Sequence, residues 1–280
     1  MNDYMVAAIS GGKDSTAMLL LMLERDMPID AVIYADTGME FPEMAAHMQK
    51  LDELLYRERG IHITTLRHPK GFEWFFFDVP LSRKNAIDMR ISKGQPVTGY
   101  GWPGPRVHWC TGHLKTKLVD KVLKQLKGDR DAIQYVGIAA DEAHRCKDDK
   151  HKRYPLVEWG ITEAQALQIC YDRGFDWDGL YKIYNRCSCW CCPLQRLGEL
   201  RKLRQHHPEL WRQLLDIDRR AIEMYGDAPM GRFKENWTVE QLDQRFSEEE
   251  RQSIFPDTIQ LGNAFGARED GWRSTLLKEG

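Results

Sequence analysis

The chain contains 280 residues, of which 42% are hydrophobic, and its formal net charge is −2. This length and composition suffice for a large globular core with a smaller appendage, and the near-neutral charge gives no general reason to expect a nucleic-acid partner. No apolar run reaches the ~18 residues that span a bilayer. A glycine-rich motif at residue 10 leaves no room for a signal peptide before it, so we expect a cytoplasmic protein without a membrane segment.

The first feature is a glycine-rich turn between a short apolar run and a helical pattern. Residues 5–9 predict a strand, and residues 15–24 predict a helix. The glycines between them allow backbone N–H groups to converge on an anion, and the helix adds its unpaired N-terminal amides. A lysine supplies positive charge to a phosphate, and an aspartate holds the Mg²⁺ that a polyphosphate carries. We therefore expect Lys13 and Asp14 to be catalytic, and ATP with Mg²⁺ to bind at Ser10, Gly11, Gly12, Lys13, Asp14 and Ser15.

Apolar runs alternate with helical patterns through the first half of the chain. After the first strand and helix, strands are predicted at residues 31–34, 61–66 and 133–138. The helices between them are predicted at residues 42–59 and, opened by residues 106–115, up to about residue 126. This alternation predicts a doubly wound α/β fold with a mostly parallel sheet, in which ligands lie at the carboxyl ends of the strands. Asp36 and Thr37 follow the second strand. We therefore expect them to face the same crevice as the glycine-rich turn.

Three stretches interrupt or follow this pattern. Residues 69–105 are rich in glycine, proline and aromatic residues, which predicts either a substrate-facing lid or partner surface, or an ordinary packed loop. Residues 147–153 are charged, and we expect a solvated loop. Two amphipathic helical patterns follow residue 193 and predict a helical appendage. We accordingly place one domain at residues 1–186, and the cysteine cluster with the C-terminal helical region at residues 187–280.

The stretch from Ser10 to Ser15, directly after a strand, resembles the PP-loop of the N-type ATP pyrophosphatases. Enzymes of that superfamily cleave ATP between its α and β phosphates and adenylate a substrate. Other segments resemble its phosphoadenosine phosphosulfate (PAPS) reductase-like branch, namely residues 36–43, 106–115, 137–145, 154–163 and 186–195. The resemblance covers most of residues 4–204 and implies an adenine nucleotide alpha hydrolase-like fold.

This resemblance adds residues to the expected nucleotide site. It implies nucleotide contacts for Gly137, Asp141 and Arg145, and it places Cys110 near the nucleotide or the sulfur chemistry as a catalytic residue. The chain departs from the family pattern at Ala139, where an arginine often stands, and this departure weakens the case for anion binding there. A position before a helix start and beside basic residues favours the thiolate form of Cys110.

Four of the seven cysteines crowd into residues 187–192. In a compartment that keeps thiols reduced, this crowding points to metal or sulfur chemistry. The spacing Cys189-x-x-Cys192 brings two thiolates onto one centre, which then requires a remote third ligand, and we expect Cys110 in that role. We predict a [4Fe–4S] cluster, with Cys187 a better fourth ligand than Cys191, and structural zinc as the alternative. The cysteines that we interpret as bystanders are Cys146 and Cys170.

Three functions are consistent with these features: an ATP-dependent enzyme that adenylates an acceptor for sulfur insertion, as in tRNA thiolation or DNA phosphorothioation by related proteins; a PAPS or adenylyl-sulfate reductase; and a non-enzymatic nucleotide-binding module with structural zinc. The reductases have an altered glycine loop and a C-terminal catalytic cysteine. We favour the first function, because this chain keeps the complete loop and has no cysteine after Cys192. The expected partners are a cysteine desulfurase and a nucleic-acid acceptor, which basic residues at 196–220 and aromatic residues at 74–102 would contact.

Overall fold

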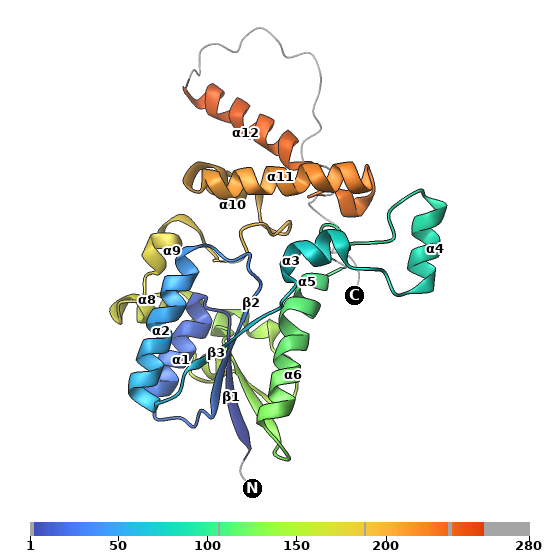
Figure 1. Ribbon diagram of the computed structural model, residues 1–280. Coiled ribbons are helices and arrows are strands. Elements are labelled where there is room, and N and C mark those ends of the chain that lie inside the picture. The colour runs from blue at the N-terminus through green and yellow to red at the C-terminus, as the bar shows by residue number, and fades with distance from the viewer. Residues whose placement is uncertain (1–2, 106, 188, 235–236, 255–280) are drawn as a thin grey trace, which may run out of the picture. The chain divides into compact units, whose positions relative to one another are not determined.

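The computed structural model describes residues 3–105, 107–187, 189–234 and 237–254 (Figure 1). The chain divides into two units, Met1–Val239 and Glu240–Gly280. Helix α12, Val239–Ile254, runs from the last residue of the first unit into the second. The functional boundary that we expect between residues 186 and 187 stays a prediction.

A five-stranded parallel sheet forms the centre of the first unit, with the strand order β3-β2-β1-β4-β5. Its first four strands confirm the predicted alternation, and the doubly wound α/β fold is therefore confirmed. Their apolar side chains explain the central positions, because β1 and β2 are covered on both faces. The strands are β1 Tyr4–Ile9, β2 Ala31–Asp36, β3 Ile63–Arg67, β4 Ala132–Val136 and β5 Lys152–Arg153.

The fifth strand corrects one expectation. Residues 147–153 were expected as a solvated loop, but Lys152 and Arg153 pair in parallel with Gln134 and Tyr135 of β4. Two charged residues carry no strand pattern that can be read from the sequence. They suit a short edge strand, whose outer side faces no further strand.

Helices cover both faces of the sheet, as Figure 1 shows: α1, α2 and α8 lie on one side and α6 on the other. Residues 17–22 of α1 are all buried, which fits a helix enclosed between the sheet and a second helix layer. On the opposite face, Leu123 of α6 packs against the buried side chains of Val6 and Ile33. These helices are α1 Lys13–Glu24, α2 Glu43–Arg59, α6 Lys117–Leu126 and α8 Glu163–Asp172.

The aromatic stretch 69–105 is a packed region with helical structure of its own. It contains α3 Gly71–Glu73, the π-helix η1 Trp74–Asp78 and α4 Lys84–Ser92. The three phenylalanines of η1 and Trp102 are buried, at most 5% exposed. Of the two alternatives, the packed loop is the one observed for these side chains, which therefore offer no stacking surface to a partner.

Shorter elements carry the chain from the sheet to a helical hairpin. The predicted amphipathic helices after residue 193 are present as α10 and α11, and each buries one face. No helix among the described residues is long and apolar enough to cross a membrane. The remaining elements of the first unit are α5 Trp109–Thr111, η2 Gly112–Thr116, η3 Ala140–Arg145, α7 Pro155–Glu158, η4 Trp177–Gly179, α9 Leu180–Ile183, α10 Leu197–His206, α11 Pro208–Tyr225 and η5 Pro229–Gly231.

Candidate nucleotide site and cysteine region

The glycine-rich turn joins β1 to α1 and is closed by its own hydrogen bonds. Ser15 Oγ donates to the carbonyl oxygen of Gly12 at 3.0 Å and accepts the amide of Ser10 at 3.2 Å. Gly11 has a φ of +77°, a backbone conformation that only glycine adopts without strain. Because Gly12 has no side chain with which to cap α1, the positive end of that helix is left facing the turn. The turn is thus shaped to receive an anion.

Two aromatic side chains from a distant part of the sequence hold this turn in place. Trp177 Nε1 donates to the Gly11 carbonyl oxygen at 2.7 Å, and the Tyr181 hydroxyl accepts the Lys13 amide at 2.8 Å. Both aromatic residues lie more than 160 positions after the turn, in η4 and α9. The sequence alone gave no signal for them, because nothing local relates them to the glycines.

The end of β4 approaches the turn so closely that only a glycine fits there. A Cβ atom on Gly137 would lie 2.6 Å from Ser15 Cα and 2.7 Å from the Ser15 nitrogen. Gly137 therefore stands against the backbone of the turn. Its expected contact with a nucleotide stays a prediction.

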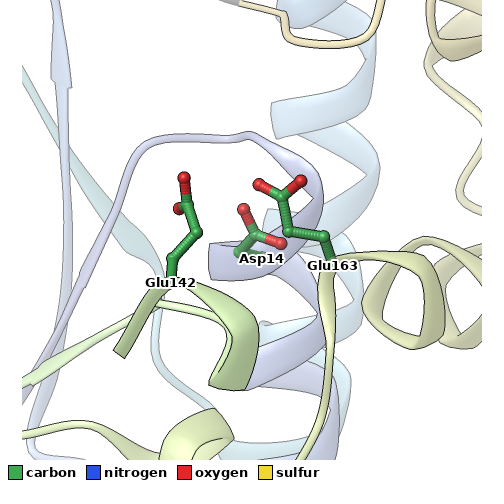
Figure 2. Close-up of side chains that lie close together, drawn as sticks. All are labelled: Asp14, Glu142 and Glu163. Carbon is green, nitrogen blue, oxygen red and sulfur yellow. The ribbon is translucent and has the colours of Figure 1, made fainter. Parts of the chain in front are cut away.

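Three carboxylates converge beside the turn, as Figure 2 shows. Asp14, Glu142 and Glu163 each offer an oxygen, and these oxygens lie within 4.8 Å of one another. Lys13 Nζ lies 3.4 Å from Asp14 and 3.2 Å from Glu163. Thr162 starts α8 with a capping box, which fixes the position of Glu163. Among the residues that the structure describes, this is the one group of three or more acidic, histidine or cysteine side chains close enough to share a metal ion.

The chemistry of this group fits a hard divalent cation. Oδ1 of Asp14 is buried and finds no hydrogen-bond partner within the described chain. Burial raises the pKa of Asp14, Lys13 counteracts part of that rise, and Glu163 adds to it. An oxygen-coordinated cation would supply the missing partner and balance the negative charge. Asp14 was predicted for this role, whereas Glu163 was not.

The two other residues expected after β4 have different partners. The Asp141 carboxylate accepts the amide of Glu163 at 3.0 Å, so it anchors the start of α8. Arg145 forms an ion pair with Glu142. Both residues therefore support the carboxylate group, and their predicted nucleotide contacts remain untested.

The turn after β2 has two sides. On one side, Asp36 Oδ1 accepts the amide of Gly38 at 2.7 Å and lines a pocket of about 460 Å³. On the other side, the Thr37 hydroxyl donates to Glu40 at 2.9 Å and lies 3.6 Å from Cys189 Sγ. Burial raises the pKa of Glu40, and Lys115 at 3.7 Å works against that rise.

The cysteine region meets this turn. Cys189 Sγ lies 3.8 Å from Glu40 Oε1, and burial raises the pKa of the Cys189 thiol to about 12. Burial also raises the pKa of Cys191 well above its usual value, and the charges of Cys189, Cys192 and Cys110 raise it further. Cys110 thus influences Cys191 electrostatically, and its expected role as a metal ligand stays a prediction.

Lys115 supplies positive charge to the same region. Burial alone would lower the pKa of its ammonium group, but the negative charges of Cys189, Glu40 and Cys110 outweigh burial and raise it. A cation beside several thiols favours their thiolate forms.

Cys187 has different neighbours. Burial raises the pKa of its thiol to about 12, while the Tyr181 hydroxyl and the charge of Lys13 oppose that rise. Cys187 thus has the Tyr181 hydroxyl and Lys13 among its neighbours, and its expected role as a metal ligand stays a prediction. Cys170, interpreted as a bystander, donates its thiol to the Lys13 carbonyl oxygen at 3.4 Å and so backs the turn.

The profile of the phosphoadenosine phosphosulfate reductase domain matches residues 4–195, from β1 to just past the cysteine cluster. The chain belongs to the phosphoadenosine phosphosulfate reductase family. This family membership confirms the resemblance, and with the phosphate-binding turn it supports a nucleotide-using enzyme of the PP-loop superfamily.

Several proteins share this family's sequence over most of the present chain. Two uncharacterised proteins of the archaeon Methanocaldococcus jannaschii are 25% and 21% identical over 79% and 76% of this chain, which covers 42% and 47% of their own lengths. An uncharacterised 37.8 kDa protein of Escherichia phage 186 is 25% identical over 73% of this chain and 71% of its own. The chain thus spans less than half the length of the archaeal relatives that it matches.

Two features of this family member that were expected to contact nucleic acid have contacts within the described chain, and their binding to nucleic acid stays a prediction. The phenylalanines of η1 are buried, and cations on α10 and α11 form ion pairs: Lys202 with Glu199, Arg219 with Asp216, and Arg220 with Glu73. Arg106, which begins one of the resembling segments, lies outside the described residues.

Proposed function

We propose that this protein is an ATP pyrophosphatase that adenylates an acceptor in preparation for sulfur insertion. The observation that carries the proposal is the pairing of a complete phosphate-binding turn with the three carboxylates Asp14, Glu142 and Glu163. A nucleotide that already carries sulfate does not release pyrophosphate, and its reaction therefore needs no cation to stabilise a pyrophosphate leaving group. ATP with Mg²⁺ needs both the turn and the carboxylates.

In the proposed reaction, an acceptor oxygen attacks the α phosphorus of ATP. A bond forms between these two atoms, and the bond from the α phosphorus to the oxygen that bridges to the β phosphate breaks, so pyrophosphate leaves. The amides at the start of α1 and the Lys13 ammonium bind the phosphates and stabilise the charge that develops on the leaving group. Mg²⁺ held by the carboxylate group would neutralise further charge on the same oxygens. Positioning and charge stabilisation together supply most of the rate in such a transfer.

The test is the release of AMP and pyrophosphate from Mg-ATP in the presence of candidate acceptors. We expect Lys13→Ala and Asp14→Ala to lose at least about a hundredfold in rate, as expected when charge stabilisation is removed, without a loss of folded protein. Glu53→Gln serves as the control, because Glu53 is exposed on α2, where its carboxylate accepts a hydrogen bond from Gln49. Equal turnover in the wild type and both variants would contradict the proposal. Reduction of PAPS without ATP would establish the reductase alternative instead.

We further propose that Cys110, Cys189 and Cys192 ligate a [4Fe–4S] cluster. Two observations support the proposal. The charges of these cysteines act on one another's pKa, and they raise the pKa of the Lys115 ammonium. A positive charge beside several thiolates stabilises them as cluster ligands. For the fourth position we propose Cys187, because the adjacent residues Cys191 and Cys192 could not both reach one metal without strain. Zinc bound by the same thiols is the alternative.

Anaerobic purification separates the two metals. An iron–sulfur protein is brown with broad absorption near roughly 400 nm from thiolate ligation, and we expect Cys189→Ala and Cys192→Ala to lose that colour. Cys146→Ala is the matched control, since Cys146 lies outside the cluster region. A colourless protein with stoichiometric zinc would refute the iron–sulfur proposal.

Sulfur insertion also requires a donor of sulfur and an acceptor oxygen. We propose a cysteine desulfurase as the donor and a nucleic acid as the acceptor. Binding of DNA or RNA that weakens as salt is raised would support the acceptor, because each neutralised phosphate releases counterions. Absence of binding at low salt would contradict it.

A further inference from the structure

The pocket of about 460 Å³ is lined by β2, the turn after it, α2 and β3, and it runs from Ile63 at the start of β3 to Arg67 at its end. Met44 and Met48 of α2 line it, and the same two side chains lie against the turn. A Cβ on Gly11 would lie 2.5 Å from Met44 Sδ and 3.0 Å from Met48 Sδ. Its volume falls in the range of small-molecule sites, about 300–1,000 Å³. A nucleotide whose phosphates bind the turn would therefore place its nucleoside in this pocket.

Two opposite charges meet in the lining of this pocket. Asp36 Oδ2 lies 3.6 Å from Arg67 Nη1, and Asp36 Oδ1 is fixed by the amide of Gly38. The Arg67 guanidinium lies over that turn, where a Cβ on Gly38 would come within 2.6 Å of Nη2. Gly38, with a φ of +79°, both forms the turn and leaves room for the arginine. The Asp36 carboxylate thus holds Arg67 beside it.

The chemistry of such a pair determines which ribose can bind. In dinucleotide-binding sheets, an acidic residue after the second strand accepts hydrogen bonds from ribose hydroxyls, whereas an arginine nearby accommodates a ribose phosphate. Here the acid and the arginine are both present, and the arginine is already engaged by the acid. Glu40 and Asp52 add two more carboxylates to the lining. A ribose phosphate would therefore meet like charge, and Arg67, the one cation among the described residues that line the pocket, already faces Asp36.

We propose that Asp36 selects adenine nucleotides whose ribose carries no 3′-phosphate, and that it does so by engaging Arg67. This inference rests on the proposed function, because it places the nucleoside of the same nucleotide. It assigns Asp36 as a specificity-determining residue that distinguishes ATP from a 3′-phosphorylated nucleotide such as PAPS.

The test compares two ligands that differ only in the 3′-phosphate, AMP and adenosine 3′,5′-bisphosphate, by calorimetry on the full chain. We expect the wild type to prefer AMP by at least about tenfold. Asp36→Asn keeps the acceptor for the Gly38 amide but removes the negative charge. It should change the ratio of the two affinities by about tenfold or more in favour of the bisphosphate. When Arg67→Gln is added to Asp36→Asn, the affinity for the bisphosphate should fall, while the affinity for AMP should change little. Glu53→Gln removes one acid from α2 outside the pocket and is the matched charge control.

Three outcomes overturn the inference. In the first, the wild type binds the bisphosphate as tightly as AMP. In the second, Asp36→Asn leaves the ratio of the two affinities unchanged. In the third, Glu53→Gln changes that ratio as much as Asp36→Asn does. Each of these results leaves the proposed adenylation intact if ATP still binds and turns over. If ATP, AMP and the bisphosphate all fail to bind, the proposed function fails along with the inference.

Discussion

Gly137→Ala tests how closely β4 must approach the phosphate-binding turn. The new Cβ would lie 2.6 Å from Ser15 Cα, 2.7 Å from the Ser15 nitrogen and 3.0 Å from the carbonyl carbon of Asp14, whereas ordinary contacts begin at 3.4 Å. All three atoms are backbone, so no side chain can rotate away, and the turn must withdraw by roughly 1 Å. Overpacking of this kind costs about 1–3 kcal/mol of unfolding free energy. A displacement of about 1 Å at a reacting centre costs roughly a hundredfold in rate.

The assay combines urea unfolding with the release of AMP from Mg-ATP. We expect the variant to remain folded with a lower urea midpoint, and to lose rate by more than its stability loss explains. Gly198→Ala is the control: Gly198 lies in α10, a Cβ there meets nothing within 4 Å, and alanine favours a helix. Unchanged stability and rate in Gly137→Ala would refute the close approach, and with it the idea that β4 sets the position of the turn.

Three further predictions follow from buried groups around the turn. Burial, together with the charge of Lys50, lowers the pKa of His47 to about 4. Since an unfolded histidine titrates near 6.5, the stability that is present above about pH 6.5 should be lost as the pH falls toward 4, by up to about 3 kcal/mol. The urea midpoint of His47→Gln should therefore depend less on pH over that window than the midpoint of the wild type. Trp177→Phe leaves the buried Gly11 carbonyl without its donor and should cost about 1–3 kcal/mol, measured by urea unfolding, together with weaker ATP binding; an unchanged midpoint would contradict the role of Trp177. Tyr181→Phe releases the Lys13 amide and should leave ATP binding equal or tighter, so a large loss of affinity in calorimetry would show that the hydroxyl itself contacts the nucleotide.

The parts of the fold that sequence reasoning recovered are local in origin. Four strands and the helices between them follow from runs of apolar residues, and the phosphate-binding turn follows from two glycines at the start of a helix. β5 was missed because its two charged residues are a strand only through their pairing with β4. The sequence also left open whether the aromatic residues at 74–77 form a surface or a core, since the same side chains suit both.

The candidate site also contains residues that a local motif indicates and residues that only tertiary packing brings together. Lys13 and Asp14 were identified because they belong to a contiguous motif. Glu163 appeared only as an acidic residue in the first turn of a helix, and Trp177 had no signal at all. Their proximity to the turn depends on the packing of α8 against α1 and of η4 against α2. Cys187 was grouped with its sequence neighbours, and in the structure the Tyr181 hydroxyl and Lys13 are near it as well. The expected set of cysteine ligands stays a prediction.

The turn after β2 links the two halves of the proposed chemistry. Asp36 contributes to the nucleotide pocket, while Thr37 and Glu40 contact Cys189. The backbone reinforces this link, because the Trp190 amide donates to the Met39 carbonyl oxygen at 3.0 Å. Glu40 is hydrogen-bonded by Thr37 through both carboxylate oxygens, so these two residues are held together within the turn. The turn after β2 therefore contacts both the pocket that we propose for the nucleoside and the cysteine that we propose as a cluster ligand, because its residues are shared between the two.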